Sequence, residues 1–449
     1  MLNTRSTFTF VTMTSLLAGL VLGGCSSDAN EPEARISTSS SSGSGGGGGG
    51  GLQACDPIGT PLLEGNAPTQ RGDMATATQG SCHRVMMWFG DQAVPKMCNF
   101  PASDFLADGY VYDTITGLWY SLDAIAESPA PIRRARARAV WDDKRERFVV
   151  FGGRFREGTS GAYTFLNDVW AFDPDTMSWS ELSPQGEATG RPKGRMNFSL
   201  DADPSNDRMI LHGGGTTDFS TFYIDSDTWA FNFETNSWQQ LATADPQPPA
   251  RIFHGSAFDV ERQRLYVFAG GSENAFLETM FKRDMWRLDL ATQTWSAVQG
   301  AEPWPLGRIK TEMLYDGPRD RIVLFGGHND SQLGNDNELW TFDLASQGWT
   351  LQKQGDVFNA PALGFCDFPS NFANIDPASP ERRESHLFER VGDAVIMYGG
   401  RTDCGLAKDT WSLDMNTLQW SQKNESFVGM TCYRSGSLGC DEPNAKMCI

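Results

Sequence analysis

The stretch NDVWAFDPDTMSW, from Asn167 to Trp179, decides the fold. It places one Trp three residues before Asp173 and a second Trp six residues after it. The reference position recurs as Asp113, Asp173, Asn232, Asp289, Asp343 and Asp414, and the later Trp as Trp119, Trp179, Trp238, Trp295, Trp349 and Trp420. The earlier aromatic residue is Tyr110, Trp170, Trp229, Trp286, Trp340 or Trp411. Because these columns hold eleven of the 14 tryptophans, the chain is built from six copies of one repeat.

A second signature lies upstream in every copy. An apolar run such as FVVFGG, residues 148–153, ends in glycine, and an Arg stands 17 to 19 residues before the first glycine. The arginines of this column are Arg71, Arg134, Arg195, Arg251, Arg308 and Arg382. Short apolar runs separated by Gly, Asp, Asn and Pro are typical of β-strands, so each copy predicts four antiparallel strands and almost no helix.

The spacing of the apolar strand, the glycine pair and the two aromatic columns resembles the kelch repeat over about residues 71–422. The resemblance implies an all-β, six-bladed kelch-type β-propeller, the fold of the central domain of galactose oxidase, with the Trp columns between neighbouring blades. A seventh, irregular blade is the alternative. The first copy departs from the pattern, with Gly90-Asp91 in place of the glycine pair and Tyr110 in place of Trp. Closure of the ring could use residues 52–70, the C-terminal tail or disulfides.

The N-terminal segment has the features of an export signal. Residues 1–25 hold an apolar run that ends in Leu22-Gly23-Gly24-Cys25, which resembles the bacterial lipoprotein box and predicts lipidation of Cys25. An ordinary secretory signal is the alternative. Residues 26–51 form a Ser/Gly linker with too little apolar surface to order itself, followed by a lead-in over 52–70, the propeller over 71–422 and a Cys-containing tail over 423–449. We therefore expect a bacterial envelope lipoprotein that meets the membrane only through its lipid.

The charge and the cysteines limit the partners and the compartment. The net charge of −19 argues against nucleic acid and anionic lipid as partners. Eight cysteines remain after Cys25, and an even number in an exported protein favours disulfides. We expect Cys82 to pair with Cys98 and Cys366 with Cys404, each within one repeat. Cys55 would then share the tail cysteines Cys432, Cys440 and Cys448, and the sequence does not choose among these.

The Arg column is the strongest candidate binding feature. By repeat symmetry the six guanidiniums would form a ring near one mouth of the channel and suit a carboxylate or phosphate. The competing interpretation pairs each Arg with an acid or a loop carbonyl of the adjacent blade. Arg136, Arg138 and Lys310 lie near the column and add positive charge without repeating.

Histidines and acidic residues give weaker signals. His254 and His386 fall on first strands and could face the channel, while His328 follows a glycine pair at a loop mouth; His212 takes the place of a packed Phe. Asp201, Asp203 and Asp207 lack the EF-hand pattern and fit a hairpin turn better. No spacing resembles the copper site of galactose oxidase, so we expect no metal and no cofactor.

The sequence leaves two function classes. The favoured one is a monomeric, non-catalytic propeller that binds a protein or glycan partner through its variable loops. The alternative is a cofactor-free epimerase or mutarotase acting on an acidic sugar, because some exported kelch propellers are sialic-acid epimerases and an Arg-lined mouth would suit a carboxylate.

Overall fold

The structure is a computed structural model that describes residues 55–92, 105–122, 129–158, 162–187, 189–216, 223–241, 244–272, 281–329, 334–358, 373–374, 376–402 and 405–424. The chain divides into two compact units, residues 1–52 and 53–449, and every described residue belongs to the second. Cys25, the Ser/Gly linker and residues 425–449 of the tail lie outside the described residues.

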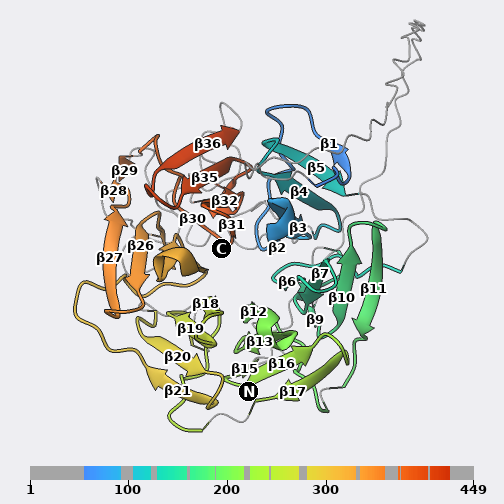
Figure 1. Ribbon diagram of the computed structural model, residues 1–449, viewed down its shortest axis with the longest axis horizontal. Helices are drawn as coiled ribbons and strands as arrows, with labels where there is room; N and C mark the ends of the chain where they lie inside the picture. Colours follow the sequence, from blue (N-terminus) through green and yellow to red (C-terminus); the bar gives the residue numbers. More distant parts are fainter. Residues whose placement is uncertain are drawn as a thin grey trace, which may run out of the picture. The chain divides into compact units, whose positions relative to one another are not determined.

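Six antiparallel sheets are arranged around an axis as the blades of a propeller, which confirms the predicted all-β, six-bladed fold (Figure 1). The helical elements of the described residues are 3-10 turns of three residues. From the axis outwards the strands are β2 (Ala75–Gln79), β3 (Arg84–Trp88), β4 (Gly109–Asp113) and β5 (Leu118–Leu122) in blade 1; β6 (Arg138–Asp142), β7 (Arg147–Phe151), β10 (Val169–Asp173) and β11 (Ser178–Ser183) in blade 2; β12 (Ser199–Asp203), β13 (Arg208–His212), β16 (Thr228–Asn232) and β17 (Ser237–Gln240) in blade 3; β18 (Gly255–Asp259), β19 (Arg264–Phe268), β20 (Met285–Asp289) and β21 (Thr294–Ala297) in blade 4; β22 (Glu312–Asp316), β23 (Arg321–Phe325), β26 (Leu339–Asp343) and β27 (Gly348–Lys353) in blade 5; and β31 (Leu387–Val391), β32 (Ala394–Tyr398), β35 (Thr410–Asp414) and β36 (Trp420–Asn424) in blade 6.

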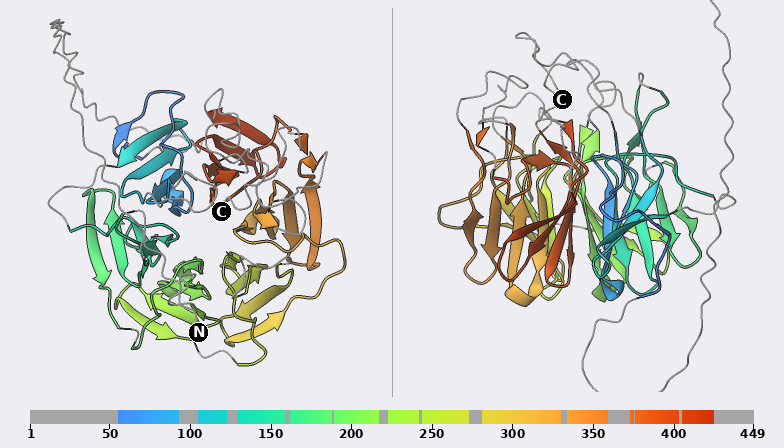
Figure 2. Two further views of the ribbon diagram at one scale, coloured as in Figure 1. Left: turned by 180° about the vertical axis from the view of Figure 1, so that it is seen from behind. Right: turned by 90° about the horizontal axis from the view of Figure 1, so that it is seen from above.

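The two ends of the propeller differ, as the side view shows (Figure 2). One end carries the turns that join the first to the second strand and the third to the fourth strand of each blade, and we call it the turn face. At the other end the second and third strands are joined by longer segments with small strands of their own, and we call it the loop face. These strands are β8 (Arg154–Phe155), β9 (Thr164–Phe165), β14 (Gly215–Thr216), β15 (Tyr223–Ile224), β24 (His328–Asn329), β25 (Gly334–Asn335), β33 (Arg401–Thr402) and β34 (Gly405–Leu406); β30 (Arg383–Glu384) pairs with β33, and β28 (Val357–Phe358) pairs with β29 (Ala373–Asn374).

Aromatic side chains join each blade to the one before it. The later Trp of the repeat packs against the residue that precedes the glycine position of the preceding blade, as in Trp179 against Trp88, whose ring centroids lie 4.9 Å apart. The other pairs are Trp238 with Phe151, Trp295 with His212, Trp349 with Phe268, Trp420 with Phe325 and Trp119 with Tyr398. Each ring can bury on the order of 200 Å², so this column supplies much of the apolar contact between blades.

The reference Asp of the repeat shapes the turn between the third and fourth strands. The Oδ1 atom of Asp173 accepts the backbone N–H groups of Asp175 and Thr176, at 2.8 and 3.3 Å. Asn232 does the same in blade 3 through its own Oδ1 atom. Short polar side chains of this kind replace backbone partners in a tight turn, which explains why the column holds only Asp and Asn.

In blade 1 the two positions of the glycine pair are occupied by Phe89 and Gly90, and not by Gly90 and Asp91 as the sequence indicated. The backbone N–H of Gly153 donates to the Arg195 carbonyl of the next blade, and Gly90 donates in the same way to Arg134. Phe89 therefore takes the first position, with a φ of 69° where Gly152 has 67°. The second position requires glycine, because a Cβ on Gly153 would lie 2.8 Å from the Ala135 carbonyl oxygen.

The ring closes by direct contact between complete blades 6 and 1. The N–H of Gly400 donates to the Arg71 carbonyl at 2.8 Å, which repeats the contact made between all other neighbouring blades. Trp119 Nε1 donates to Thr410 Oγ1 at 2.9 Å. The Tyr398 hydroxyl donates to the lead-in carbonyls of Pro68 and Thr69. The lead-in also adds β1 (Thr60–Pro61) to the outer edge of blade 1.

The described disulfide corrects one predicted pairing. Cys82 is bonded to Cys55 and not to Cys98, so the bridge ties the lead-in to the turn between β2 and β3. Cys98, Cys366, Cys404, Cys432, Cys440 and Cys448 lie outside the described residues.

Candidate functional site

The predicted Arg column lies inside the blades. The side chains of Arg71, Arg134, Arg195, Arg251 and Arg308 are fully buried. Arg134 is representative, because its Nη1 donates to the Gly152 carbonyl at 3.1 Å and its two Nη atoms meet the carboxylate of Asp168 at 2.7 and 2.8 Å. These guanidiniums therefore bind groups of their own blade, and not of the adjacent blade as the competing interpretation expected, and they leave no open ring of positive charge at the channel mouth.

In blade 6 the column residue is Arg383 and not Arg382. Arg383 makes the contacts of the column, to the carbonyls of Glu381 and Gly399 and to the carboxylate of Asp409. Arg382 is also buried, with its Nε 3.1 Å from Asp356 Oδ2. The turn between β31 and β32 spans only residues 392–393, two fewer than in the other blades. The distance from the Arg to the first glycine is therefore shorter in blade 6, and the usual spacing pointed to Arg382 in place of Arg383.

The partners of the Arg column form an acidic column that the sequence analysis missed. Each acid lies two residues before the first aromatic residue of the repeat and, in five blades, also accepts a hydrogen bond from that Trp, as Asp168 does from Trp170 Nε1 at 2.9 Å. The column consists of Asp108, Asp168, Asp227, Asp284, Glu338 and Asp409. The constant spacing of this acid from the aromatic position was a signal available in the sequence.

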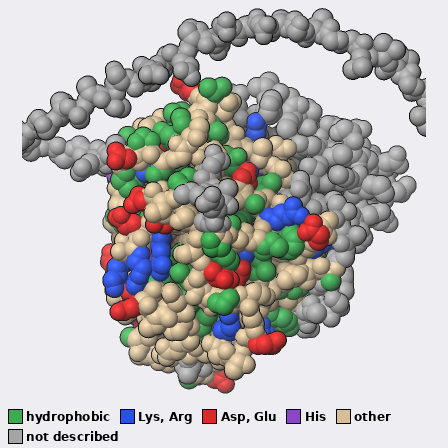
Figure 3. Space-filling model, turned by 90° about the vertical axis from the view of Figure 1, so that its right-hand side faces the viewer, with side chains coloured by type: hydrophobic (Ala, Val, Ile, Leu, Met, Phe, Trp, Pro, Cys, Tyr) green, Lys and Arg blue, Asp and Glu red, His purple; other side chains and the backbone are tan. Residues whose placement is uncertain are grey.

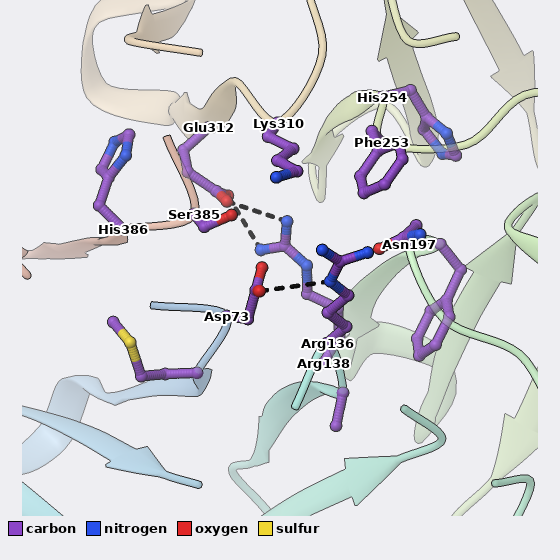
Figure 4. Close-up of a pocket in the computed structure, with 13 residues that line it drawn as sticks. Asp73, Arg136, Arg138, Asn197, Phe253, His254, Lys310, Glu312, Ser385 and His386 are labelled. Carbon is purple, nitrogen blue, oxygen red and sulfur yellow. Dashed lines mark hydrogen bonds and ion pairs between the residues drawn. The ribbon is translucent and has the colours of Figure 1, made fainter. Parts of the chain in front are cut away.

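The residues two positions after the column Arg surround the axis at the loop face. All six have a positive φ of 54° to 59°: Asp73, Arg136, Asn197, Phe253, Lys310 and Ser385. Their backbones are linked from blade to blade, for example by the N–H of Arg136 to the Asp73 carbonyl and the N–H of Lys310 to the Phe253 carbonyl. Unlike the Arg column, their side chains line a cavity on the axis (Figure 4).

Charged side chains gather at this mouth. We define the vestibule by Asp73, Asp91, Arg136, Arg154, Lys310, Glu384 and Arg401. Two pairs are close, with Arg136 Nε 3.2 Å from Asp73 and Lys310 Nζ 2.6 Å from Glu384. Arg154 and Arg401 approach Asp91 and Glu384 only to 3.9 Å. Four cations thus face three carboxylates in a protein whose net charge is −19.

The pKa shifts agree with this excess of positive charge. Burial opposes ionisation of Asp73, but the charges of Arg136, Lys310, Arg401 and Arg154 outweigh it and lower the pKa of Asp73. Burial, together with the nearby charge of Arg136, lowers the pKa of Arg154 to about 10. Burial also lowers the pKa of Lys310, against the attraction of Glu384. Burial opposes ionisation of Arg136 as well, but the charge of Asp73 outweighs it and raises the pKa of Arg136. Arg154 and Lys310 are therefore the incompletely neutralised cations of the vestibule, which is the condition under which an anion binds.

An aromatic residue extends the vestibule on the blade 2 side. The ring of Tyr163 contacts two guanidiniums, with Arg154 Cζ 4.3 Å and Arg156 Cζ 4.5 Å from its centroid. Such stacking orients a guanidinium while leaving its edge available to a carboxylate. Arg156 thereby adds a fifth cation at the rim.

An ion pair across the axis separates the vestibule from a deeper cavity. Arg138 on β6 and Glu312 on β22 belong to blades 2 and 5, which stand opposite each other in a ring of six (Figure 1), and they meet through two N···O contacts of 2.9 Å. Both residues line the vestibule cavity, of about 40 Å³, and a second cavity of about 300 Å³ on the side of the turn face. We call the second cavity the chamber.

The histidines occupy different environments. His254 and His386 line the vestibule cavity but are buried, with 3% and 4% of their surface exposed. His212 packs on Trp295 and hydrogen-bonds Thr228 Oγ1 at 3.0 Å. His328 lies on β24 at the loop face, and its Nδ1 is 2.9 Å from Asn335 Oδ1. Of these residues only His328 stands among the loop-face strands where a partner could reach it.

Metal binding has no support in the part of the chain that the structure describes, where no group of three or more His, Cys, Asp or Glu side chains is placed to hold an ion. Asp203 is the last residue of β12, where it accepts hydrogen bonds from Asn206 and Arg208 beside the hairpin turn of blade 3. Asp207 lies in the turn, whereas Asp201 lies within β12 and not in the turn that the sequence indicated. Within the same described ranges, no helix is long and apolar enough to cross a membrane.

A family model described as the KLHDC2/KLHL20/DRC7 Kelch-repeats domain matches residues 58–270, 145–366 and 283–439. The chain belongs to the kelch-repeat family. The kelch relatives include the Kelch domain-containing protein 10 of Xenopus tropicalis, 25% identical over 65% of this chain, and the Kelch domain-containing protein 2 of Bos taurus, 32% identical over 37% of it. A further relative is the Leucine-zipper-like transcriptional regulator 1 homolog of Drosophila melanogaster, 24% identical over 73% of this chain. The matches span 65%, 36% and 30% of the lengths of these three proteins.

Proposed function

We propose that this kelch propeller is a binding protein that receives an acidic group of a protein or glycan partner at its vestibule. The kelch propeller is an architecture suited to protein binding, and its loop face holds the channel mouth. The observation that carries the proposal is the excess of cations there, Arg136, Arg154, Lys310 and Arg401 against three carboxylates. We further propose that lipid on Cys25 holds the protein at the bacterial cell envelope.

One outer side of the propeller differs from the vestibule in its charge distribution. On the side of the molecule seen in Figure 3, apolar, acidic and basic side chains are interspersed. A cluster of one sign in a concave, partly dehydrated place attracts an opposite charge more strongly than scattered surface charges do. An acidic partner would therefore gain more electrostatic binding energy at the vestibule than on the side seen in Figure 3.

The test uses the full chain and two defined probes, a fluorescent penta-aspartate peptide and an oligosaccharide that ends in a uronic acid. The double variant Arg154→Gln, Arg401→Gln should weaken binding of the preferred probe at least tenfold and reduce its dependence on salt. Lys423→Gln removes one charge from an exposed position on outer strand β36 and should change nothing. Equal binding by all three proteins would refute the vestibule as the site.

An enzyme acting on an acidic sugar is the second candidate, and the same excess of cations favours it. Lys310 and Glu384 form a buried acid–base pair at 2.6 Å beside the axis, and a sugar carboxylate held by Arg401, whose Nε is 3.9 Å from Glu384, would lie beside that pair. The check is NMR of acidic sugars mixed with the full chain. Interconversion of the sugar that is lost in the Arg154→Gln, Arg401→Gln variant would favour an enzyme. If the wild-type chain binds the sugar but its NMR spectrum does not change with time, the protein is a binding protein.

A further inference from the structure

The chamber on the turn-face side of the Arg138–Glu312 pair has the opposite electrical character to the vestibule. Its wall contains the carboxylates of Asp143, Asp201, Glu312 and Glu389, and the guanidinium of Arg138 is the cation among its lining residues. Arg138 is committed to Glu312 by both of its bonds, so the remaining three acids have no cationic partner in the wall. The channel is therefore basic at one end and acidic at the other.

The inner acids are held by hydroxyl groups of the neighbouring blade. Glu389 accepts hydrogen bonds from Thr76 Oγ1 at 2.7 Å and Thr78 Oγ1 at 3.0 Å, and Asp201 accepts one from Ser256 Oγ at 2.8 Å. A hydroxyl stabilises a carboxylate without neutralising it, so negative charge remains in the chamber. Burial and the neighbouring acids raise the pKa of Asp201 to about 7 and also raise the pKa of Glu389, so the negative charge of the chamber develops fully only above neutral pH.

A buried polar side chain directed at the same space lacks a partner. Ser199 is 3% exposed, lines the chamber, and its Oγ has no hydrogen-bond partner in the described structure. It stands four residues after the column Arg of its blade, the same position that Arg138 and Glu312 occupy in theirs, and those two side chains meet on the axis. A buried hydroxyl without a partner is costly, and a ligand or water in the chamber would supply one.

Besides the polar residues Thr76, Thr78, His254 and Ser256, much of the remaining wall is apolar and aromatic. Trp141, Phe258, Leu314 and Phe388 all line the chamber. Its volume of about 300 Å³ is at the lower end of the range of small-molecule sites, which combine apolar walls with a few directed polar groups. Aromatic rings beside carboxylates are a common means of holding an ammonium group that has lost its water.

We propose that the chamber is a second binding site, for a small organic cation that carries an ammonium group. The ammonium would donate hydrogen bonds to Asp201, Glu389 and Ser199, and the carbon skeleton would lie against the aromatic wall. The Arg138–Glu312 pair separates this site from the vestibule, so the two sites are independent and the chamber does not depend on the function proposed for the loop face.

The test is calorimetric titration of the full chain, at pH 8 and low salt, with putrescine and with 1,4-butanediol, which has the same skeleton without charge. We expect saturable binding of putrescine at one site and at least tenfold weaker binding of the diol. Asp201→Asn and Glu389→Gln should each weaken putrescine binding at least tenfold. Both substitutions keep the size of the side chain and remove a buried charge, so the variants should fold, as circular dichroism would verify.

Two matched variants locate the effect. Glu234→Gln removes an exposed acid from the rim of the turn face and should leave putrescine binding unchanged. Lys423→Gln removes an exposed charge from outer strand β36 and should also leave it unchanged. No saturable binding by the wild-type chain, unaltered binding in both chamber variants, equal binding of the diol, or displacement of putrescine by equimolar Ca²⁺ or Mg²⁺ would each overturn the proposal.

Discussion

Arg138 and Glu312 lie 174 residues apart in the chain and join opposite blades across the channel axis through two contacts of 2.9 Å. Their side chains are 34% and 13% exposed, so the pair is partly shielded from water. A bidentate bond of this kind fixes the positions of both blades, and it forms the partition between the vestibule and the chamber.

Replacing one member of this pair should destabilise the fold more than replacing both members. We expect Arg138→Gln to lower the free energy of unfolding by about 1 to 3 kcal/mol, because Glu312 would remain in an acidic cavity without its partner. The double variant Arg138→Gln, Glu312→Gln should recover part of that loss. Urea unfolding of the wild type, both single variants and the double variant measures the coupling, and strictly additive effects would contradict it.

The Arg column should behave as a structural element. Arg134→Ala would leave the carboxylate of Asp168, which is 8% exposed, without its cation, so we expect a loss of about 3 to 5 kcal/mol of stability. The neighbouring Arg133 is 45% exposed, pairs with an exposed Glu157 and lies over the Phe155 ring, so Arg133→Ala should cost about 1 kcal/mol of stability or less. Thermal unfolding compares the two, and a well-folded Arg134→Ala variant that only lost ligand binding would argue for a binding role.

His212 should make the protein sensitive to acid. Burial lowers its pKa to about 3, whereas the unfolded chain takes up a proton near pH 6.5. Between these values the unfolded state binds the additional proton, so stability falls as the pH drops below 6.5. His212→Phe, which restores the ring found in three other blades, should lose less stability than the wild type between pH 7 and pH 4.5. Thermal unfolding of both proteins across this pH range measures the difference, and an equal loss of stability in the wild type and the variant would show the prediction to be wrong.

Asp201 should have the opposite pH dependence. Its pKa is raised from 3.8 to about 7, so the folded protein retains a proton that the unfolded chain has released, and stability falls as the pH rises from about 4 to 7. Asp201→Asn should therefore stabilise the protein at pH 8, by about 1 to 4 kcal/mol, and have little effect at pH 4. Denaturant titrations at the two pH values measure the difference, for which Glu234→Gln again serves as the control.

The disulfide can be checked directly. Peptide mapping under non-reducing conditions should recover Cys55 linked to Cys82, and recovery of a Cys82–Cys98 peptide would contradict the structure. Because the bridge closes a segment of 27 residues, Cys55→Ser should reduce stability by about 3 kcal/mol. Binding at the vestibule should persist in this variant, since the bridge lies at the turn face.

The sequence was sufficient for the fold because the repeat places the same side chain in the same contact six times. The column that runs from Trp119 to Trp420 predicted the packing between blades, and the glycines predicted the ends of the second strands. The shift from Arg382 to Arg383 was missed because a two-residue turn at Gly392 shortens only blade 6. Aligning the six repeats compares equivalent positions, so it identifies the residues that all blades share and misses a change in length that is confined to one blade.

The candidate sites depend instead on where the blades differ. Arg136, Arg138 and Lys310 stood out in the sequence as charges that do not repeat, yet nothing in their spacing indicated that Arg138 would reach Glu312 on the opposite blade. The meeting of Asp201 with Ser256 and of Glu389 with Thr76 likewise requires the ring to be closed. The vestibule and the chamber could therefore be recognised only after folding had brought these positions together.

The bridge between Cys55 and Cys82 also decides which end of the channel the lead-in borders. It fastens the lead-in to the β2–β3 turn, at the end of the propeller away from the vestibule. Reduction of the bridge would therefore free the lead-in on the side of the acidic chamber and leave the contacts around the basic mouth intact.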